Sequence, residues 1–305
     1  LIRLASSNFL KISESFFDLS ADRLVQQRGL LIISSNQNNV WLSNSTFTIN
    51  FKTTAQDLSV IFLADFNIFL LEKICVGPVT SLSTRRNSIF FIDFNCSNQI
   101  NIENSKVFEW RANVLAVFLG VETRNEINIQ NCFISSLREN ITLLIANLNN
   151  TIRLVKCSIT STFSSRNTSA IFSLFILRKE NTFLVSELFY QNLIGYRLAS
   201  LIDRQNSLVV ENSSFFNCSI KFGNATLFLL TDHNNISLFL SNITAVRNEE
   251  AASFWASTFL NSYAGMLLFR KKCTIFIKNN RFFNLLSGVG GVKIIKFLSF
   301  FKEKT

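Results

Sequence analysis

The amino-acid sequence predicts an all-β fold, a right-handed parallel β-helix (β-solenoid) of about ten coils. Three observations predict this fold. A short motif recurs along the chain, its apolar residues alternate with polar ones, and Asn recurs at one position inside it. The clearest copy is SLVVENSSFFN, from Ser207 to Asn217. Copies follow one another at intervals of about 25 to 38 residues, which is typical of repeat architectures.

The motif is numbered from its first aliphatic residue. In the clearest copy this position zero is Leu208, and Val210, Asn212, Ser213 and Phe215 follow at offsets two, four, five and seven. Nine further copies align with it. The zero positions of all the copies are Ile2, Val40, Phe69, Ile100, Ile127, Ile152, Phe183, Leu208, Leu238 and Ile275.

Offsets zero, two and seven hold apolar residues in every copy, whereas offset three is mostly Ser, Glu, Gln or Lys. Alternation with a period of two predicts a strand that buries one face. We therefore expect offsets zero, two and seven to point into the core.

Offset four is the position at which Asn recurs. Asn tolerates a positive φ better than other non-Gly residues, so a recurrent Asn between two strand segments predicts a tight left-handed bend. If consecutive bends stack, their amides form a structural Asn ladder. Its predicted members are Asn44, Asn104, Asn131, Asn212, Asn242 and Asn279.

The chain then divides into coils in order. Leu1 to Leu10 is expected to be the first rung, and Lys11 to Gly29 a long polar loop. From Ser88 onward a second apolar run precedes each motif, as in SIFFIDF at Ser88 and ITLLIANL at Ile141. These runs predict a second sheet of the same prism.

The segments SLVVENSSFFN, QINIENSKVF, EINIQNCFI and CTIFIKNNRFFN resemble rungs of the pectin-lyase-like right-handed β-helix superfamily. This resemblance covers nearly the whole chain and implies a fold without implying an activity. Phe282-Phe283-Asn284 followed by Gly290-Gly291-Val292 is similar to the FxxN and GGA(I/V) signatures of polymorphic outer-membrane-type surface proteins. That likeness implies a place at the cell surface.

Because a solenoid grows without splitting, residues 1–305 are expected to form a single β-helix domain. No apolar run reaches the ~18 residues that a spanning helix needs, so no transmembrane span is predicted. The chain lacks an initiator Met, and we expect it to be a fragment of a longer repeat array.

The sequence contains no clustered carboxylates of the kind that glycosidases and lyases use. Its aspartates stand singly, and the only histidine is His233. The aspartates in question are Asp57, Asp65, Asp93, Asp203 and Asp232. We predict no catalytic residues, no bound metal and no cofactor.

Cys132 and Cys157 occupy offset five of consecutive copies, which would place their Cα atoms about 4.8 Å apart. That spacing allows a disulfide. The alternative, a stacked pair of buried thiols, is slightly favoured. None of the six cysteines forms a CxxC motif, so a zinc site is not expected.

The net charge is +10, but Lys and Arg are scattered along the chain, so nucleic-acid binding is not predicted. Sequons of the form N-x-S/T give mild support for secretion and for a glycoprotein. They begin at Asn44, Asn95, Asn140, Asn149, Asn167, Asn212, Asn217, Asn224, Asn235 and Asn242.

Two functional hypotheses follow. The first is a non-enzymatic extracellular or cell-surface β-helix, membrane-associated through other segments, that serves as a structural stalk or as an adhesion surface for glycans or other surface proteins. The alternative is a polysaccharide-binding or carbohydrate-active β-helix, a lyase or hydrolase. It would need a groove with aromatic residues, for which Trp41, Trp110, Phe239 and Phe276 are the candidates.

Overall fold

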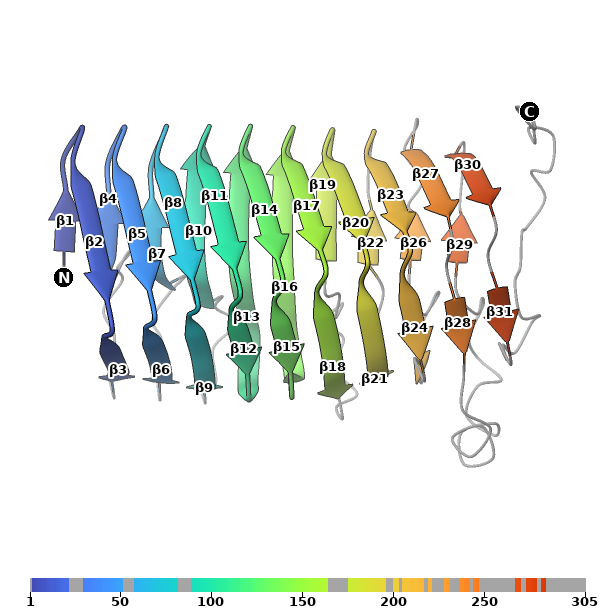
Figure 1. The fold of residues 1–305 in the computed structure, drawn as a ribbon, viewed down its shortest axis with the longest axis horizontal. Helices are drawn as coiled ribbons and strands as arrows, with labels where there is room; N and C mark the ends of the chain where they lie inside the picture. Colours follow the sequence, from blue (N-terminus) through green and yellow to red (C-terminus); the bar gives the residue numbers. More distant parts are fainter. Residues whose placement is uncertain are drawn as a thin grey trace.

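The structure, a computed structural model, describes residues 2–21, 30–51, 58–81, 89–163, 175–195, 200–202, 205–216, 219–220, 228–230, 236–241, 244–246, 267–269, 273–278 and 281–283. The regular secondary structure in these residues consists of β-strands alone, and the strands stack in parallel along one axis (Figure 1). In Figure 1 the front strands run downward, the rear strands run upward and the coils advance from left to right, so the winding is right-handed. The predicted right-handed parallel β-helix is confirmed.

Sheet B, the front sheet, has ten strands and carries offsets minus one to three of the motif. Its strands are β2 (Phe9–Ser13), β5 (Asn39–Ser43), β8 (Ile68–Glu72), β11 (Gln99–Glu103), β14 (Glu126–Gln130), β17 (Thr151–Val155), β20 (Thr182–Ser186), β23 (Ser207–Glu211), β27 (Ile236–Ser241) and β30 (Cys273–Lys278). Each strand pairs with the next in unbroken register, as Ile100 does with Ile127 and Ile127 with Ile152.

Sheet A has 21 strands and forms two further walls of the prism. The rear wall contains β1 (Ile2–Leu4), β4 (Ile32–Ser34), β7 (Leu58–Leu63), β10 (Ile89–Cys96), β13 (Trp110–Thr123), β16 (Arg138–Leu148), β19 (Phe175–Lys179), β22 (Ser200–Ile202), β26 (Phe228–Leu230) and β29 (Leu267–Phe269). From β10 to β26 these strands lie in the apolar runs that the sequence predicted ahead of each motif from Ser88 onward.

The lower wall of sheet A follows the motif's bend. It contains β3 (Phe16–Ala21), β6 (Thr46–Phe51), β9 (Cys75–Ser81), β12 (Lys106–Phe108), β15 (Phe133–Ser135), β18 (Ser158–Phe163), β21 (Phe189–Gly195), β24 (Ser214–Phe216), β25 (Ser219–Ile220), β28 (Thr244–Val246) and β31 (Arg281–Phe283). Strand β13 joins the two walls, because its first residues pair with β9 and its later residues pair with β10 and β16.

The core fills the prism with the predicted apolar positions. Offsets zero, two and seven are buried wherever the structure describes their side chains from the second coil onward, as in Val40, Leu42 and Phe47, each at most 1% exposed. Burial at this level stabilises the fold by about 1.5–3 kcal/mol for each large side chain before entropy is counted. Part of the core is aromatic, and the rings of Phe91 and Phe118 stack 5.5 Å apart.

The first motif copy was predicted at the wrong place. Ile2 lies in β1 and pairs with Ile32 of the rear wall, whereas Leu10 pairs with Val40 of sheet B. The first copy therefore begins at Leu10, and the first interval is 40 − 10 = 30 residues rather than 40 − 2 = 38. The polar loop predicted from Lys11 to Gly29 is wrong up to residue 21, because β2 continues to Ser13 and β3 spans Phe16–Ala21, and residues 22–29 lie outside the described ones. The segments that begin at Ile2 and at Leu10 both alternate with a period of two, so only the pairing between coils shows which of them is the first motif copy.

Candidate functional site: the corner ladders and the outer face of sheet B

A row of buried asparagines lies at the corner that leads into sheet B, two residues before position zero. Each member in the second to eighth coils is at most 2% exposed. The row consists of Asn38, Asn67, Asn98, Asn125, Asn150, Asn181 and Asn206, and the exposed Asn8 occupies the same position in the first coil.

Asn125 shows how one member of this row connects three coils. Its Oδ1 accepts hydrogen bonds from the backbone N–H of Asn98 at 2.8 Å and from the Asn98 Nδ2 at 3.0 Å. Its Nδ2 donates to the backbone oxygen of Asn95 at 2.9 Å and to the Oδ1 of Asn150 at 3.2 Å. Every polar atom of this buried amide therefore has a partner, which removes the penalty of burying it.

The same contact repeats from coil to coil. From Asn67 to Asn181, each backbone N–H donates to the Oδ1 of the next member at 2.8–2.9 Å. The pattern changes at the N-terminal end, where the Ser34 hydroxyl donates to the Asn67 Oδ1 at 2.9 Å and the buried Asn38 Nδ2 has no partner. The backbone N–H of Asn38 still donates to the Asn67 Oδ1 at 3.0 Å and that of Asn8 to the Asn38 Oδ1 at 2.8 Å. The row is therefore a continuous hydrogen-bonded ladder whose backbone-to-amide bonds reach the first coil.

Sequence reasoning missed this ladder, although a signal was present. Once the first copy is placed at Leu10, the position two residues before zero is Asn in every coil from Asn8 to Asn206. This position precedes position zero, so it lies outside the motif on which the prediction was based.

The predicted bends at offset four lie in the left-handed region. Asn44, Asn104, Asn131 and Asn212 have φ between 47° and 52°, and their side chains are exposed. Glu14, Lys73, Lys156 and Glu187 occupy the same position in other coils with φ of 52° to 53°. The bend therefore belongs to the backbone and accepts several side chains. Stacking of the Asn amides at this corner stays a prediction, and Asn242 and Asn279 lie outside the described residues.

A second row occupies offset five, directly after this bend, with Ser or Cys in most of the first eight coils and Ile74 and Leu188 in two of them. The Ser45 hydroxyl donates to the backbone oxygen of Ser43 at 2.7 Å and accepts from the backbone N–H of Ser15 at 3.2 Å. Ser105 repeats both contacts, with Glu103 at 2.7 Å and with Ile74 at 3.2 Å. Small hydroxyl groups thus connect adjacent coils at the second corner of sheet B.

Cys132 and Cys157 take the place of serine in two consecutive coils of this row. Both are buried free thiols, and their sulfurs donate to the backbone oxygens of Gln130 at 3.2 Å and Val155 at 3.3 Å. The pKa of Cys132 is raised, mainly by its hydrogen bond with the Cys157 thiol and also by burial. The favoured interpretation, a stacked pair of thiols, matches this arrangement, and a disulfide between them stays a prediction.

An apolar patch, hereafter the sheet B patch, lies at the N-terminal end of sheet B. Phe9, Trp41, Ile68 and Leu70 belong to the strands of the sheet, and Phe66 lies at the corner two residues before β8. Phe9, Phe66 and Ile68 are 66%, 59% and 47% exposed. Phe9 and Ile68 both align with the middle strand's Asn39, so they lie in one row across three coils.

One of the two outer rows of the patch becomes polar farther along sheet B, whereas the row of Trp41 and Leu70 passes through Asn101, Asn128 and Arg153 to the half-buried Leu184 and Val209. The row of Phe9 and Ile68 continues as Gln99, Glu126 and Thr151 in register. Among the described side chains on the strands of sheet B, the most exposed large apolar ones, Phe9 and Ile68, lie in the first three coils. An exposed apolar cluster of this kind marks an interaction surface.

Two of the candidate aromatics for a polysaccharide groove, Trp41 and Trp110, have described side chains. The Lys11 Nζ lies 4.1 Å from the ring centroid of Trp41, a cation–π contact, and Leu70 is the neighbour of Trp41 on the next strand. Trp110, a candidate aromatic for a polysaccharide groove, is instead buried: it is 2% exposed and its Nε1 donates to the backbone oxygen of Val76 at 3.2 Å. It begins β13 with its ring in the core. The side chains of Phe239 and Phe276 lie outside the described residues.

Of the single aspartates, two lie in the described part of the chain. The Asp65 Oδ1 accepts from the Asn95 Nδ2 at 2.7 Å and from the Cys96 backbone N–H at 3.0 Å, so this carboxylate holds a corner. Burial, reinforced by the Asp65 charge, raises the pKa of Cys96. Asp93 pairs in register with residues that carry no carboxylate, Phe62 and Gly120. Asp57, Asp203, Asp232 and His233 lie outside the described residues.

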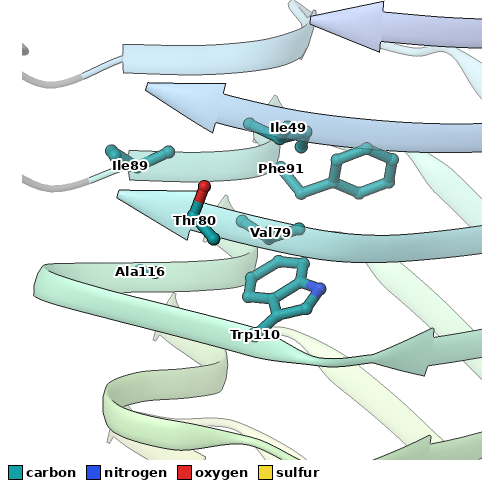
Figure 2. A pocket seen from close by; sticks show the side chains of 7 residues that line it. All are labelled: Ile49, Val79, Thr80, Ile89, Phe91, Trp110 and Ala116. Carbon is teal, nitrogen blue, oxygen red and sulfur yellow. The ribbon is translucent and has the colours of Figure 1, made fainter. Parts of the chain in front are cut away.

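Within the described ranges, no group of three or more His, Cys, Asp or Glu side chains could hold a metal ion. A small cavity lies where the lower and rear walls meet (Figure 2). Its water-sized free volume is about 10 Å³, which suffices for one water at most. Apart from Thr80 its lining is apolar: Ile49, Val79, Ile89, Phe91, Trp110 and Ala116. The cavity is a packing gap rather than a ligand site.

No protein-family model, no curated protein and no solved structure matches this chain. Over the residues that the structure describes, no helix has the length and apolar character needed to cross a membrane. The class of the protein is therefore defined by its fold, a parallel β-solenoid with all-parallel sheets.

Proposed function

We propose that this chain is a non-enzymatic β-helical rod at the cell surface or outside the cell, where it serves as a structural stalk and an adhesion surface. The observation that carries the proposal is the internal Asn ladder, which ties each coil to the next through buried amides. A rod held together from coil to coil resists bending and local opening. The nine steps between the ten strands of sheet B give it a length of about 43 Å.

The sheet B patch supplies the adhesive part of the proposal. Exposed aromatic side chains on a flat, rigid sheet bury large areas on contact without a loss of backbone entropy. Partners of this kind are glycans or other surface proteins. The polysaccharide-binding alternative is less well supported, because the Trp41 ring lies beside Lys11 and Leu70 and Trp110 is in the core.

Bead adhesion under flow tests the proposal. Beads coated with the chain are offered to cells of the organism that makes it, and the shear that detaches half of the beads is measured. The test variant replaces Phe9, Phe66 and Ile68 by Ser, Ser and Thr. The matched control replaces Phe133 and Phe189, exposed aromatics of the lower wall, by Ser.

We expect the patch variant to detach at several-fold lower shear and the control to behave like the wild-type chain. Equal adhesion of both variants would contradict the adhesive role. Release of reducing ends or unsaturated sugars from plant or microbial polysaccharides by the wild-type chain would contradict the non-enzymatic role.

A further inference from the structure

We propose that Asn44, Asn149 and Asn212 carry N-linked glycans along the two edges of sheet B. Each begins a sequon: Asn44-Ser45-Thr46, Asn149-Asn150-Thr151 and Asn212-Ser213-Ser214. The inference rests on the proposed function, because N-glycosylation requires entry into a secretory pathway.

The corner geometry makes all three sequons compatible with a glycan. Each Asn is exposed at a left-handed bend, with φ of 47°, 54° and 48°. The middle residue of each sequon points inward as part of one of the two ladders and is 1% exposed. The hydroxyl residue that follows is partly exposed on the outer side of the next strand. A glycan on the Asn therefore extends into solvent while the ladder stays closed.

A fourth described sequon, Asn95-Cys96-Ser97, lacks this geometry. The Asn95 side chain is half-buried, and its Nδ2 donates to the Asp65 Oδ1 at 2.7 Å. A glycan on that nitrogen would replace the donor and open the corner that Asp65 holds. In the sequon of Asn140 the hydroxyl residue Thr142 is fully buried. The structure thus divides the sequons into permitted and disfavoured ones.

Two further bends provide matched controls. Asn104 and Asn131 are exposed at the same corner with positive φ, but the residues two positions later are Lys106 and Phe133. Lys106 is exposed and lies in the same row as Thr46, because both residues pair with Cys75 of the coil between them. Lys106→Thr therefore creates a sequon at Asn104 with a residue that another coil already uses at this place.

The modification joins the amide nitrogen of Asn to C1 of the first sugar of a polyprenyl-pyrophosphate-linked oligosaccharide. The bond between that C1 and the pyrophosphate oxygen breaks, and the amide proton goes to the released pyrophosphate. No oxidant or reductant is needed. Asn44 and Asn212 would line one edge of sheet B and Asn149 the other.

Peptide mapping of the full chain, recovered from the culture medium or surface of the organism that makes it, tests the inference. Peptide-N-glycosidase in ¹⁸O-water converts each glycosylated Asn to labelled Asp, which mass spectrometry locates. We expect label at Asn44, Asn149 and Asn212, none at Asn95, and one additional glycan at Asn104 in a secreted Lys106→Thr variant.

The outcomes separate this inference from the proposed function. An extracellular chain without label at the three corners would overturn the inference and leave the rod intact. Occupancy at Asn95 equal to that at Asn44 would overturn the geometric argument. A chain found only in the cytoplasm would overturn both the glycans and the proposed location.

Discussion

Asn206 and Asn212 lie six residues apart in one coil, at opposite ends of β23, yet their environments are opposite. The Asn206 side chain is 1% exposed, and its Oδ1 accepts from the backbone N–H and the Nδ2 of Asn181. The Asn212 side chain is exposed, and what distinguishes this residue is its backbone, with φ of 48°. One corner needs the amide, whereas the other needs the conformation.

The substitutions found at each corner agree with this difference. Each of the first eight coils, from Asn8 to Asn206, has Asn at the first corner, where a buried group must both donate and accept between coils. At the second corner Glu14, Lys73 and Lys156 share the bend with Asn. Its backbone N–H bonds to the next coil whatever the side chain, as Asn44 does to Glu72 at 3.0 Å and Lys73 to Glu103 at 3.0 Å.

The largest expected effect concerns the register on which this comparison depends. Val210 is fully buried in the middle of β23, so Val210→Asp places an unpaired carboxylate in the core and should cost several kcal/mol of unfolding free energy. Glu211→Lys, one residue later on the outer side, should change it by less than about 0.5 kcal/mol. Urea unfolding of both variants checks the pair, and equal shifts would mean that the register is wrong.

Next in size is Asn125→Ala in the buried ladder. The substitution leaves the Asn98 backbone N–H and the Asn95 backbone oxygen without their present partner. A buried group left unpaired costs about 1–3 kcal/mol, so the two together should lower the unfolding free energy by about 2–6 kcal/mol. The measurement is again urea unfolding, supported by faster amide exchange at Asn98. A loss below 0.5 kcal/mol, roughly the size of a surface substitution, would show that the ladder is not needed.

A smaller graded effect is expected at the exposed corner. Asn212→Val puts a β-branched residue at positive φ and should cost about 1–3 kcal/mol. Asn212→Gly keeps the backbone permitted and should cost less, about 0.5–1.5 kcal/mol for lost side-chain hydrogen bonds. The expected order of midpoints in a urea titration is wild type, then Gly, then Val. Val at or above the wild-type midpoint would move the bend elsewhere.

The smallest effect is expected for Asn131→Lys. Lys73 and Lys156 already occupy this corner in other coils with the same φ, so the change in unfolding free energy should stay within about 0.5 kcal/mol. This variant is the direct counterpart of Asn125→Ala, because Asn125 and Asn131 lie at the two corners that flank β14 in one coil. If the two variants destabilised the chain equally, the proposed division between the corners would be untenable.

The amino-acid sequence by itself determined the fold class and the inward rows. A strand that buries one face must alternate with a period of two, and that local pattern is visible at positions such as Val40 and Leu42 without any partner strand. It also indicated the left-handed bend at Asn44, because a positive φ restricts the residue itself.

Only the tertiary structure decided where the first coil begins and which asparagines form the buried ladder. Ile2 and Leu10 both start an alternating apolar segment, and pairing with Val40 selects Leu10. Consecutive members among Asn98, Asn125 and Asn150 are 27 and 25 residues apart. Their amides meet only because the coils between them, although of different residue number, return to the same corner and stack in register. Hydrogen bonds of that range depend on the stacking of whole coils, which no local pattern contains.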